Sequence, residues 1–146
     1  MDVTLGTSPE LIAQAHAIRH QVFVIEQNIP KQLDLDGLDE EAIHVVVTDV
    51  GSLVATARLV KRDKFCAVMA RIAVLKQYRG VGVAKLVINA LLSHAGKIGL
   101  ESIEIHAHAY LQGYYQRYGF KYIKDVEKVG EHQLIEMQCS LKSEVR

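Results

Sequence analysis

The sequence predicts an α+β fold, in which helices flank a mixed sheet. Three strand-like runs follow one another between residues 43 and 75 with no helix between them, which favours a meander over a fully alternating parallel sheet. A long helical pattern and then a strand–helix–strand unit follow. Hydrophobic residues make up 49% and charged residues 23% of the 146 positions, a balance typical of a globular domain with a hydrophobic core. We expect residues 1–146 to form a single domain.

The first expected elements are a short strand over residues 3–6 and a helix that starts at Ser8. Ser8 is a favoured N-cap residue, Pro9 suits the first helical position, and Glu10 suits the positive end of the helix dipole. Apolar residues then continue to about Gln27 and form one broad face: Leu11, Ile12, Ala15, Ile18, Val22, Phe23 and Ile25.

Residues 31–42 are rich in Asp and Glu and predict a solvated loop near the mouth of a site. A calcium loop of the EF-hand type that starts at Asp34 needs Gly at its sixth position. Gly37 is the fourth residue instead, which disfavours calcium binding.

The later elements follow from apolar periodicity and from turn residues. Residues 43–49 and 53–60 predict a β-hairpin, because a short turn separates two runs rich in Val, Ala and Thr. The further expected elements are a strand over 65–75, a helix over 82–97 that ends before Gly99, a strand over 100–106, a short helix over 107–118, a strand from Phe120 and a last strand over 132–141.

Composition disfavours several classes of protein. The formal net charge of +0 argues against a dedicated nucleic-acid binder, whose affinity rests on Lys and Arg. No apolar run is long enough to span a membrane, and residues 1–10 lack the basic and apolar regions of a signal peptide. Cys66 and Cys139 are isolated in apolar contexts and predict thiols in a reducing compartment, hence a cytoplasmic protein.

A predicted strand, a short turn and a predicted helix meet at residues 76–82. The first N–H groups of a helix have no partner within the helix and carry partial positive charge, so such a helix start favours an anion. Gly80 and Gly82 remove Cβ atoms where a ligand would approach the backbone. No Walker A motif is present, and Lys85 in the third slot of a dinucleotide fingerprint would disrupt helix–strand packing. We therefore expect a phosphate or pyrophosphate site of another kind.

Three segments carry a resemblance to a known family. Gln77-Tyr-Arg-Gly-Val-Gly82, which follows Ala70-Arg-Ile-Ala-Val74, resembles the acetyl-CoA pyrophosphate loop of the GNAT acetyltransferase superfamily. Tyr114-Tyr-Gln-Arg-Tyr-Gly-Phe120 is similar to the Phe-Tyr-Glu-Lys-Leu-Gly-Phe segment of that family, and Arg19-His-Gln-Val-Phe-Val-Ile-Glu-Gln27 is similar to the Arg-x-x-Val-Phe-x-x-Glu-Gln segment of its small bacterial-type subgroup. The resemblance implies a mixed, mostly antiparallel sheet of about seven strands, splayed at the acyl-CoA site.

The resemblance also implies a site for acetyl-CoA as cosubstrate, with no metal. Backbone N–H groups of the turn would hold the pyrophosphate, Arg79 would add a charge-assisted bond, and the N–H of Val74 would bind the thioester oxygen. Tyr115 matches the usual general acid of the family, whereas His108 stands where the family usually has Asn or Gln. The implied cosubstrate-binding residues are Ile72, Ala73, Val74, Gln77, Arg79, Gly80, Val81, Gly82, Val83, Ala84, His108 and Tyr115.

The implied reaction moves an acetyl group to a primary amine without a covalent enzyme intermediate. The amine must lose a proton, because a free ammonium has a pKa of about 10, and the leaving thiolate needs a proton that a phenol such as Tyr115 can supply. The alternative general bases are Glu26, His44, His108 and His132. The acceptor is a small-molecule amine or a peptide or protein amine, and four acidic residues would favour a cationic one: Asp34, Asp36, Asp39 and Glu40.

Two other functions stay open. The chain could bind acyl-CoA without turnover, and Tyr115→Phe would separate that module from an enzyme. A zinc hydrolase is the third hypothesis, because His106 and His108 face the same side of a strand and could chelate a metal together with His44 or His132. A homodimer is compatible with the resemblance, since many such folds pair through their C-terminal strands.

Overall fold

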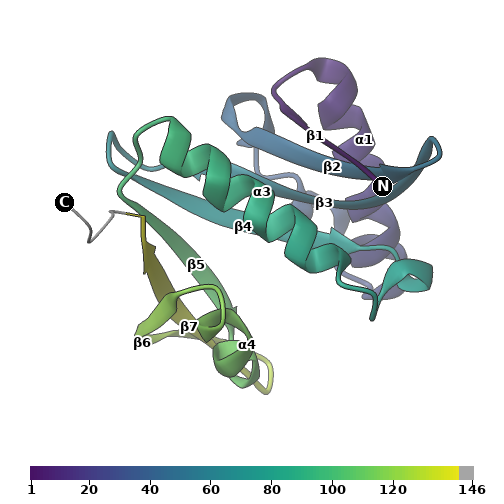
Figure 1. Ribbon diagram of the computed structural model, residues 1–146. Coiled ribbons are helices and arrows are strands. Elements are labelled where there is room, and N and C mark those ends of the chain that lie inside the picture. Colours follow the sequence, from purple (N-terminus) through teal and green to yellow (C-terminus); the bar gives the residue numbers. More distant parts are fainter. Residues whose placement is uncertain (142–146) are drawn as a thin grey trace. The chain divides into compact units, whose positions relative to one another are not determined.

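The computed structural model of the chain describes residues 1–141 (Figure 1). Its seven strands form a mixed sheet in the order β1-β2-β3-β4-β5-β7-β6. The strands are β1 (Asp2–Gly6), β2 (Ile43–Asp49), β3 (Ser52–Lys61), β4 (Cys66–Val74), β5 (Ser102–His108), β6 (Phe120–Val129) and β7 (His132–Ser140). The β4–β5 ladder is parallel, whereas β1–β2, β2–β3, β5–β7 and β6–β7 are antiparallel. The predicted mixed, mostly antiparallel sheet is therefore confirmed.

The helical segments are α1 (Pro9–Arg19), a π-helix (His20–Glu26), α2 (Lys31–Asp34), α3 (Val83–Lys97), α4 (Gln112–Gln116) and 3₁₀ turns at Asp39–Glu41, Lys76–Tyr78 and Ala109–Leu111. Within residues 1–141, none of these segments has both the length and the apolar character that a membrane span requires. The described chain divides into two compact units, Met1–Val60 with Met69–Ser93 and Lys61–Val68 with residues 94–141.

In the first unit, helices cover both faces of strands β1 to β4 (Figure 1). On one face, Leu11 and Ile18 of α1 pack with Val46 of β2 and Ala73 of β4. Neighbouring residues of a strand point to opposite faces, so the fully buried Val45 turns to the other face of β2. The helix α3 lies over that face, with buried apolar side chains at Val83, Val87, Ile88 and Leu91.

The hairpin β2–β3 forms as predicted. Its two turn residues, Val50 and Gly51, both have positive φ, at 49° and 82°. Positive φ at both central positions defines the type I′ turn, whose twist matches that of the flanking strands.

The helix that starts at Ser8 changes form halfway. Ser8 caps it as predicted, since its Oγ accepts a hydrogen bond from the Leu11 N–H at 3.1 Å. The predicted continuation to about Gln27 is a π-helix from His20 onward, and Glu26 is its last residue. π-Helical turns are rare in proteins, and those that occur are often found at functional sites.

The second unit contains the antiparallel strands β5, β7 and β6. Its buried apolar residues include Ile103, Ile105, Phe120, Ile135 and Met137. The helix predicted over residues 107–118 is shorter than expected, because Ala107 and His108 pair with residues of β7 and belong to β5. The tyrosine spacing in this segment fits a helix, but pairing with β7 decides the conformation of its first two residues.

The acidic segment 31–42 is not the solvated loop that its composition predicts. It contains α2 and a 3₁₀ turn, and Asp34 and Asp39 are each 6% exposed. A buried carboxylate is unfavourable unless a partner compensates its charge. The partners are arginines on other elements, which composition alone does not reveal: Arg19, Arg58 and Arg71.

Candidate active site

The turn between β4 and α3 has the geometry of an anion site. A 3₁₀ turn at Lys76–Tyr78 leads into Gly80 and Gly82, whose φ values are +83° and +82°. Residues that carry a side chain rarely adopt this left-handed backbone conformation, whereas glycine adopts it freely. The helix α3 begins at Val83 directly after it, so its first N–H groups lack partners within the helix. The predicted order of strand, glycine turn and helix is present.

Arg79 in this turn contacts both the π-helix and β4. Its Nη1 and Nη2 donate to the two Glu26 carboxylate oxygens at 2.5 and 2.8 Å, and its Nε donates to the Val74 carbonyl at 2.9 Å. The hydrogen bond from Arg79 lowers the pKa of Glu26 below its usual value, and the same bond raises the pKa of Arg79. The structure thus brings together three of the predicted site residues.

The last residues of β4 directly precede this turn. Ala73 is buried against α1, whereas Ile72 and Val74 are half-buried. Just before them, Arg71 has a φ of 58°. This left-handed backbone conformation is uncommon for residues other than Gly, Asn and Asp. Such residues occur often at functional sites.

In the second unit, two of the predicted bases lie together. His108 ends β5 and His132 begins β7, and their rings meet edge to face with centroids 5.1 Å apart. His108 also contacts Tyr110, at a centroid distance of 5.3 Å. The Nδ1 atom of His108 is buried and has no hydrogen-bond partner.

Tyr115 lies on α4 of the same unit. Its ring contacts Tyr114 and Phe120 at centroid distances of 5.2 and 6.0 Å. Burial, with a smaller effect of the neighbouring Tyr114, raises the pKa of Tyr115 to about 12. A phenol with that pKa is protonated at neutral pH, which is the form that a proton donor requires.

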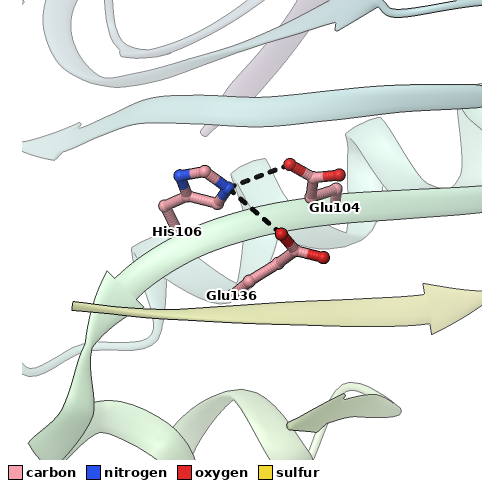
Figure 2. Close-up of side chains that lie close together, drawn as sticks. All are labelled: Glu104, His106 and Glu136. Atoms are coloured by element: carbon pink, nitrogen blue, oxygen red, sulfur yellow. Dashed lines mark hydrogen bonds and ion pairs between the residues drawn. The ribbon is translucent and has the colours of Figure 1, made fainter. Parts of the chain in front are cut away.

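A further cluster in the second unit was not singled out by the sequence analysis (Figure 2). His106 Nε2 lies 2.9 Å from Glu104 Oε2 and 3.8 Å from Glu136 Oε1. Arg62 also forms an ion pair with Glu104. Among residues 1–141, this is the single group of three His, Cys, Asp or Glu whose ligand atoms are close enough for one metal ion. The predicted set of His106 and His108 with His44 or His132 does not form such a group within residues 1–141.

The sequence of β5 contains part of the signal for this cluster. Glu104 and His106 are two residues apart on β5, which places both side chains on one face. Glu136 pairs with His106 across the β5–β7 ladder. Only the strand register, which the sequence does not specify, brings the third residue to the other two.

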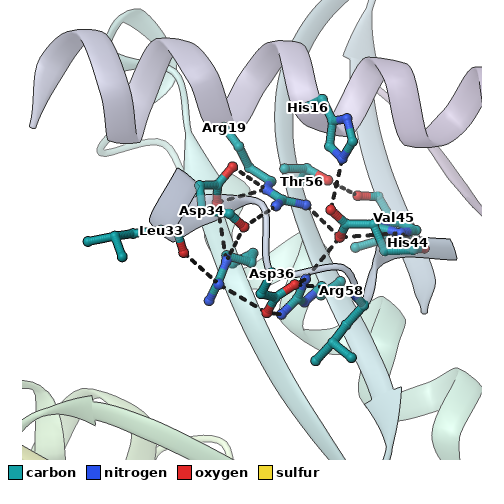
Figure 3. Close-up of polar contacts among 12 residues, drawn as sticks. His16, Arg19, Leu33, Asp34, Asp36, His44, Val45, Thr56 and Arg58 are labelled. Carbon is teal, nitrogen blue, oxygen red and sulfur yellow. Dashed lines mark hydrogen bonds and ion pairs between the residues drawn. The ribbon is translucent and has the colours of Figure 1, made fainter. Parts of the chain in front are cut away.

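A buried network of charges fixes the acidic segment of the first unit (Figure 3). Arg19 donates from Nε to the Asp34 carboxylate at 3.1 Å and from Nη1 to Asp39 at 2.8 Å. Arg58 donates to Asp39 at 2.9 Å and to Asp36 at 2.5 Å. Burial raises the pKa of Asp39, but hydrogen bonds from Arg19, His16 and Arg58 outweigh it and hold this pKa well below the usual value. The hydrogen bond from Arg58 lowers the pKa of Asp36 to about 2.

Two predictions for this region are corrected by the network. Arg71 also pairs with Asp34 and Asp36, at 3.1 and 3.2 Å. Arginines therefore balance the charges of these two carboxylates and of Asp39, which leaves the exposed Glu40 as the remaining acid of the predicted four. His44 is fully buried, and its Nε2 lies 2.8 Å from the Asp39 carbonyl oxygen. Its ring is therefore closed to a substrate, which removes His44 from the general bases.

The strand order, the parallel β4–β5 pair and the glycine turn before α3 define the fold of acyl-CoA N-acyltransferases. The family model of the acetyltransferase (GNAT) domain matches residues 9–141, and the chain belongs to this family. It is an acyl-CoA-dependent N-acetyltransferase.

Relatives with similar sequences and structures support this assignment. The chain is 29% identical over 127 residues to the uncharacterised N-acetyltransferase YjcF of Bacillus subtilis, with 87% of this chain and 90% of YjcF covered. It is 31% identical over 122 residues to the protein ElaA of Escherichia coli, with 79% and 80% covered. The crystal structure of an acyl-CoA N-acyltransferase from Pseudomonas aeruginosa superposes with a TM-score of 0.85 at 28% identity, covering 94% of this chain and 98% of that one.

Proposed function

We propose that residues 1–146 act as one catalytic domain that transfers an acetyl group from acetyl-CoA to a primary amine. The observation that carries this proposal is the pair of left-handed glycines, Gly80 and Gly82, directly before the N-terminus of α3. Membership of the GNAT family supports acyl transfer from a CoA thioester.

The cosubstrate site that we propose is formed by the turn and the end of β4. The N–H groups from Arg79 to Ala84 would bind the pyrophosphate, because they lie at the positive end of α3. The Arg79 N–H now bonds to the Lys76 carbonyl oxygen at 3.3 Å and would exchange that partner for the pyrophosphate. Gln77 lies in the same turn, and the pantetheine arm would follow Ile72 to Val74 as an added strand. The parallel β4–β5 ladder joins Cys66–Val68 to Ser102–Glu104.

The reaction that we propose needs a base that takes a proton from the acceptor and an acid that gives a proton to the leaving thiolate. A general base takes a proton from the acceptor ammonium, and the free amine attacks the thioester carbonyl, whose oxyanion the Val74 N–H stabilises. The C–S bond then breaks, and the thiolate takes a proton from Tyr115. The nitrogen loses its second proton as the neutral amide forms, and this proton restores the Tyr115 phenolate to the phenol. Glu26, His108 and His132 remain as general bases.

The acceptor that we propose is an amine on a small molecule, peptide or protein. Because Asp34, Asp36 and Asp39 are paired with arginines, selectivity for a polycation does not follow from this segment. Cys66 and Cys139 are both free and buried, which supports a reducing location such as the cytoplasm.

A screen of amines with acetyl-CoA, read by the release of free thiol, tests the proposal. The accepted amine then serves for Tyr115→Phe, which should lower kcat about 10²- to 10⁴-fold, the usual contribution of a general acid. CoA affinity, measured by calorimetry, should stay nearly unchanged. Tyr122→Phe on β6 is the matched control, because Tyr122 is 44% exposed and its hydroxyl bonds to Asp125.

Three outcomes separate the hypotheses. Absence of CoA binding to the wild-type chain would contradict the proposal altogether. CoA binding without thiol release from any amine would favour the non-catalytic module. An unchanged kcat in Tyr115→Phe would be compatible with an enzyme but would exclude Tyr115 as its general acid.

A further inference from the structure

The guanidinium of Arg79 is held by two groups of the first unit. Its two terminal nitrogens form a bidentate pair with Glu26, and its Nε bonds to the Val74 carbonyl. A carboxylate and a phosphate both prefer the same parallel pair of N–H donors from an arginine. The Arg79 fork therefore cannot serve Glu26 and a pyrophosphate fully at the same time.

We propose that Glu26 competes with the pyrophosphate of acyl-CoA for Arg79, so that cosubstrate binding frees the Glu26 carboxylate. This inference rests on the proposed function, because it takes the turn at residues 76–82 as the pyrophosphate site. It adds a coupling between the two substrates: the carboxylate is released only when the acyl donor is bound.

The exposure of the pair makes the exchange feasible. The side chains of Arg79 and Glu26 are 39% and 33% exposed, and ion pairs with this access to water contribute little to stability. A pyrophosphate carries more negative charge than one carboxylate, and it would gain the N–H groups at the start of α3 in addition. Arg79 exchanges a weak partner for a stronger one.

The exchange changes the chemistry of Glu26. The hydrogen bond from Arg79 is the largest cause of its lowered pKa, so loss of Arg79 moves this pKa back toward its usual value and makes the carboxylate a stronger base. Arg79 joins the Glu26 carboxylate to the Val74 carbonyl through one guanidinium. The freed carboxylate thus lies close to the end of β4, where the thioester is proposed to be held, and it suits an incoming ammonium.

Calorimetric titration of CoA into four chains tests the competition: wild type, Glu26→Gln, Arg79→Ala and the double variant. Removal of the Glu26 charge should lower the Kd of CoA about two- to fivefold, the range expected for an exposed ion pair. Arg79→Ala should weaken binding. In the Arg79→Ala background, Glu26→Gln should have no further effect, because no guanidinium remains to compete for.

Glu41→Gln is the matched control, since Glu41 is an exposed acid of the same unit outside the proposed site. It should leave the Kd of CoA unchanged, whereas an equal gain in affinity would show a general charge effect and overturn the competition. An unchanged or raised Kd in Glu26→Gln would also overturn it, as would a Glu26→Gln effect that persists without Arg79. If the wild-type chain does not bind CoA, the proposed function itself fails, and this result is distinct from the others.

Discussion

Arg19 and Asp39 form a buried ion pair, in which Arg19 Nη1 donates to Asp39 Oδ1 at 2.8 Å. The Arg19 side chain is 1% exposed, and Asp39 also accepts a hydrogen bond from Arg58. The Asp39 carboxylate therefore joins two buried guanidinium groups, which also pair with Asp34 and Asp36.

Asp39→Asn should strongly destabilise the chain. The amide is nearly isosteric but takes one of two carboxylate partners from both Arg19 and Arg58. The loss of one partner of a buried pair costs about 3–5 kcal/mol, and the remaining pairs with Asp34 and Asp36 place the expected cost at the lower end of that range. Urea unfolding at pH 7 measures the change. Glu40→Gln, at the exposed neighbouring position, should stay within about 0.5 kcal/mol of wild type. Similar effects of the two substitutions would show that the network contributes no more than surface charge.

The same network predicts a loss of stability in acid. The pKa of Asp36 is lowered to about 2 and that of Asp39 is lowered as well. A group with a lowered folded-state pKa contributes stability above its unfolded pKa of about 4 and loses it as the pH falls through the folded value. The urea midpoint should thus be level from about pH 7 to 5 and decline from about pH 4 to 2. Asp36→Asn should lower the midpoint at pH 7 and flatten this decline, and an undiminished decline would remove Asp36 as a source.

The glycine turn can be tested with two substitutions that differ in backbone conformation. Gly82→Ala should destabilise the chain by about 1–2 kcal/mol, because Gly82 has a φ of +82°. It should also weaken CoA binding. Gly96→Ala in α3 introduces a Cβ that meets no atom within 4 Å and should stabilise the chain by about 0.5–1 kcal/mol. Urea unfolding and CoA calorimetry give both readouts, and equal effects at the two positions would contradict a conformational role for Gly82.

Metal removal should leave the acyl transfer unchanged. Arg62 forms an ion pair with Glu104, so one carboxylate of the Glu104–His106–Glu136 cluster already has a cationic partner. Chelator treatment followed by the thiol-release assay and by metal analysis of the purified chain provides the check. A stoichiometric metal whose loss abolishes activity would overturn the expectation of a metal-free enzyme.

The fold was accessible from the sequence where a local signal exists. Ser8 and Pro9 mark the start of α1, and the Val50–Gly51 turn marks the hairpin, because caps and turns depend on neighbouring residues. The acidic segment shows the opposite case. Its composition predicts a solvated loop, but Asp34 and Asp39 are buried because arginines on α1, β3 and β4 pair with them, and such distant partners leave no local pattern.

The candidate site divides in the same way. The glycine turn was predicted from its spacing, since Gly80 and Gly82 act through their own backbone. The pairing of Glu26 with Arg79 joins residues 53 positions apart, and the contact of His108 with His132 depends on the β5–β7 register. Sequence spacing names these side chains as candidates, but only the fold shows which of them meet.

The raised pKa of Tyr115 predicts the alkaline side of the pH profile. Burial raises this pKa to about 12, so the phenol keeps its proton up to about pH 10. As the pH rises, kcat should increase while the general base loses its proton, and it should then not fall up to about pH 10. Steady-state rates from about pH 6 to 10 at saturating acetyl-CoA measure this profile. In Tyr115→Phe, kcat should be lower at every pH, but its rise with pH on the acid side should be the same as in wild type, because the general base is unchanged. A fall of the wild-type kcat between about pH 8 and 9 would show that a group with a lower pKa than that of Tyr115 donates the proton to the thiolate.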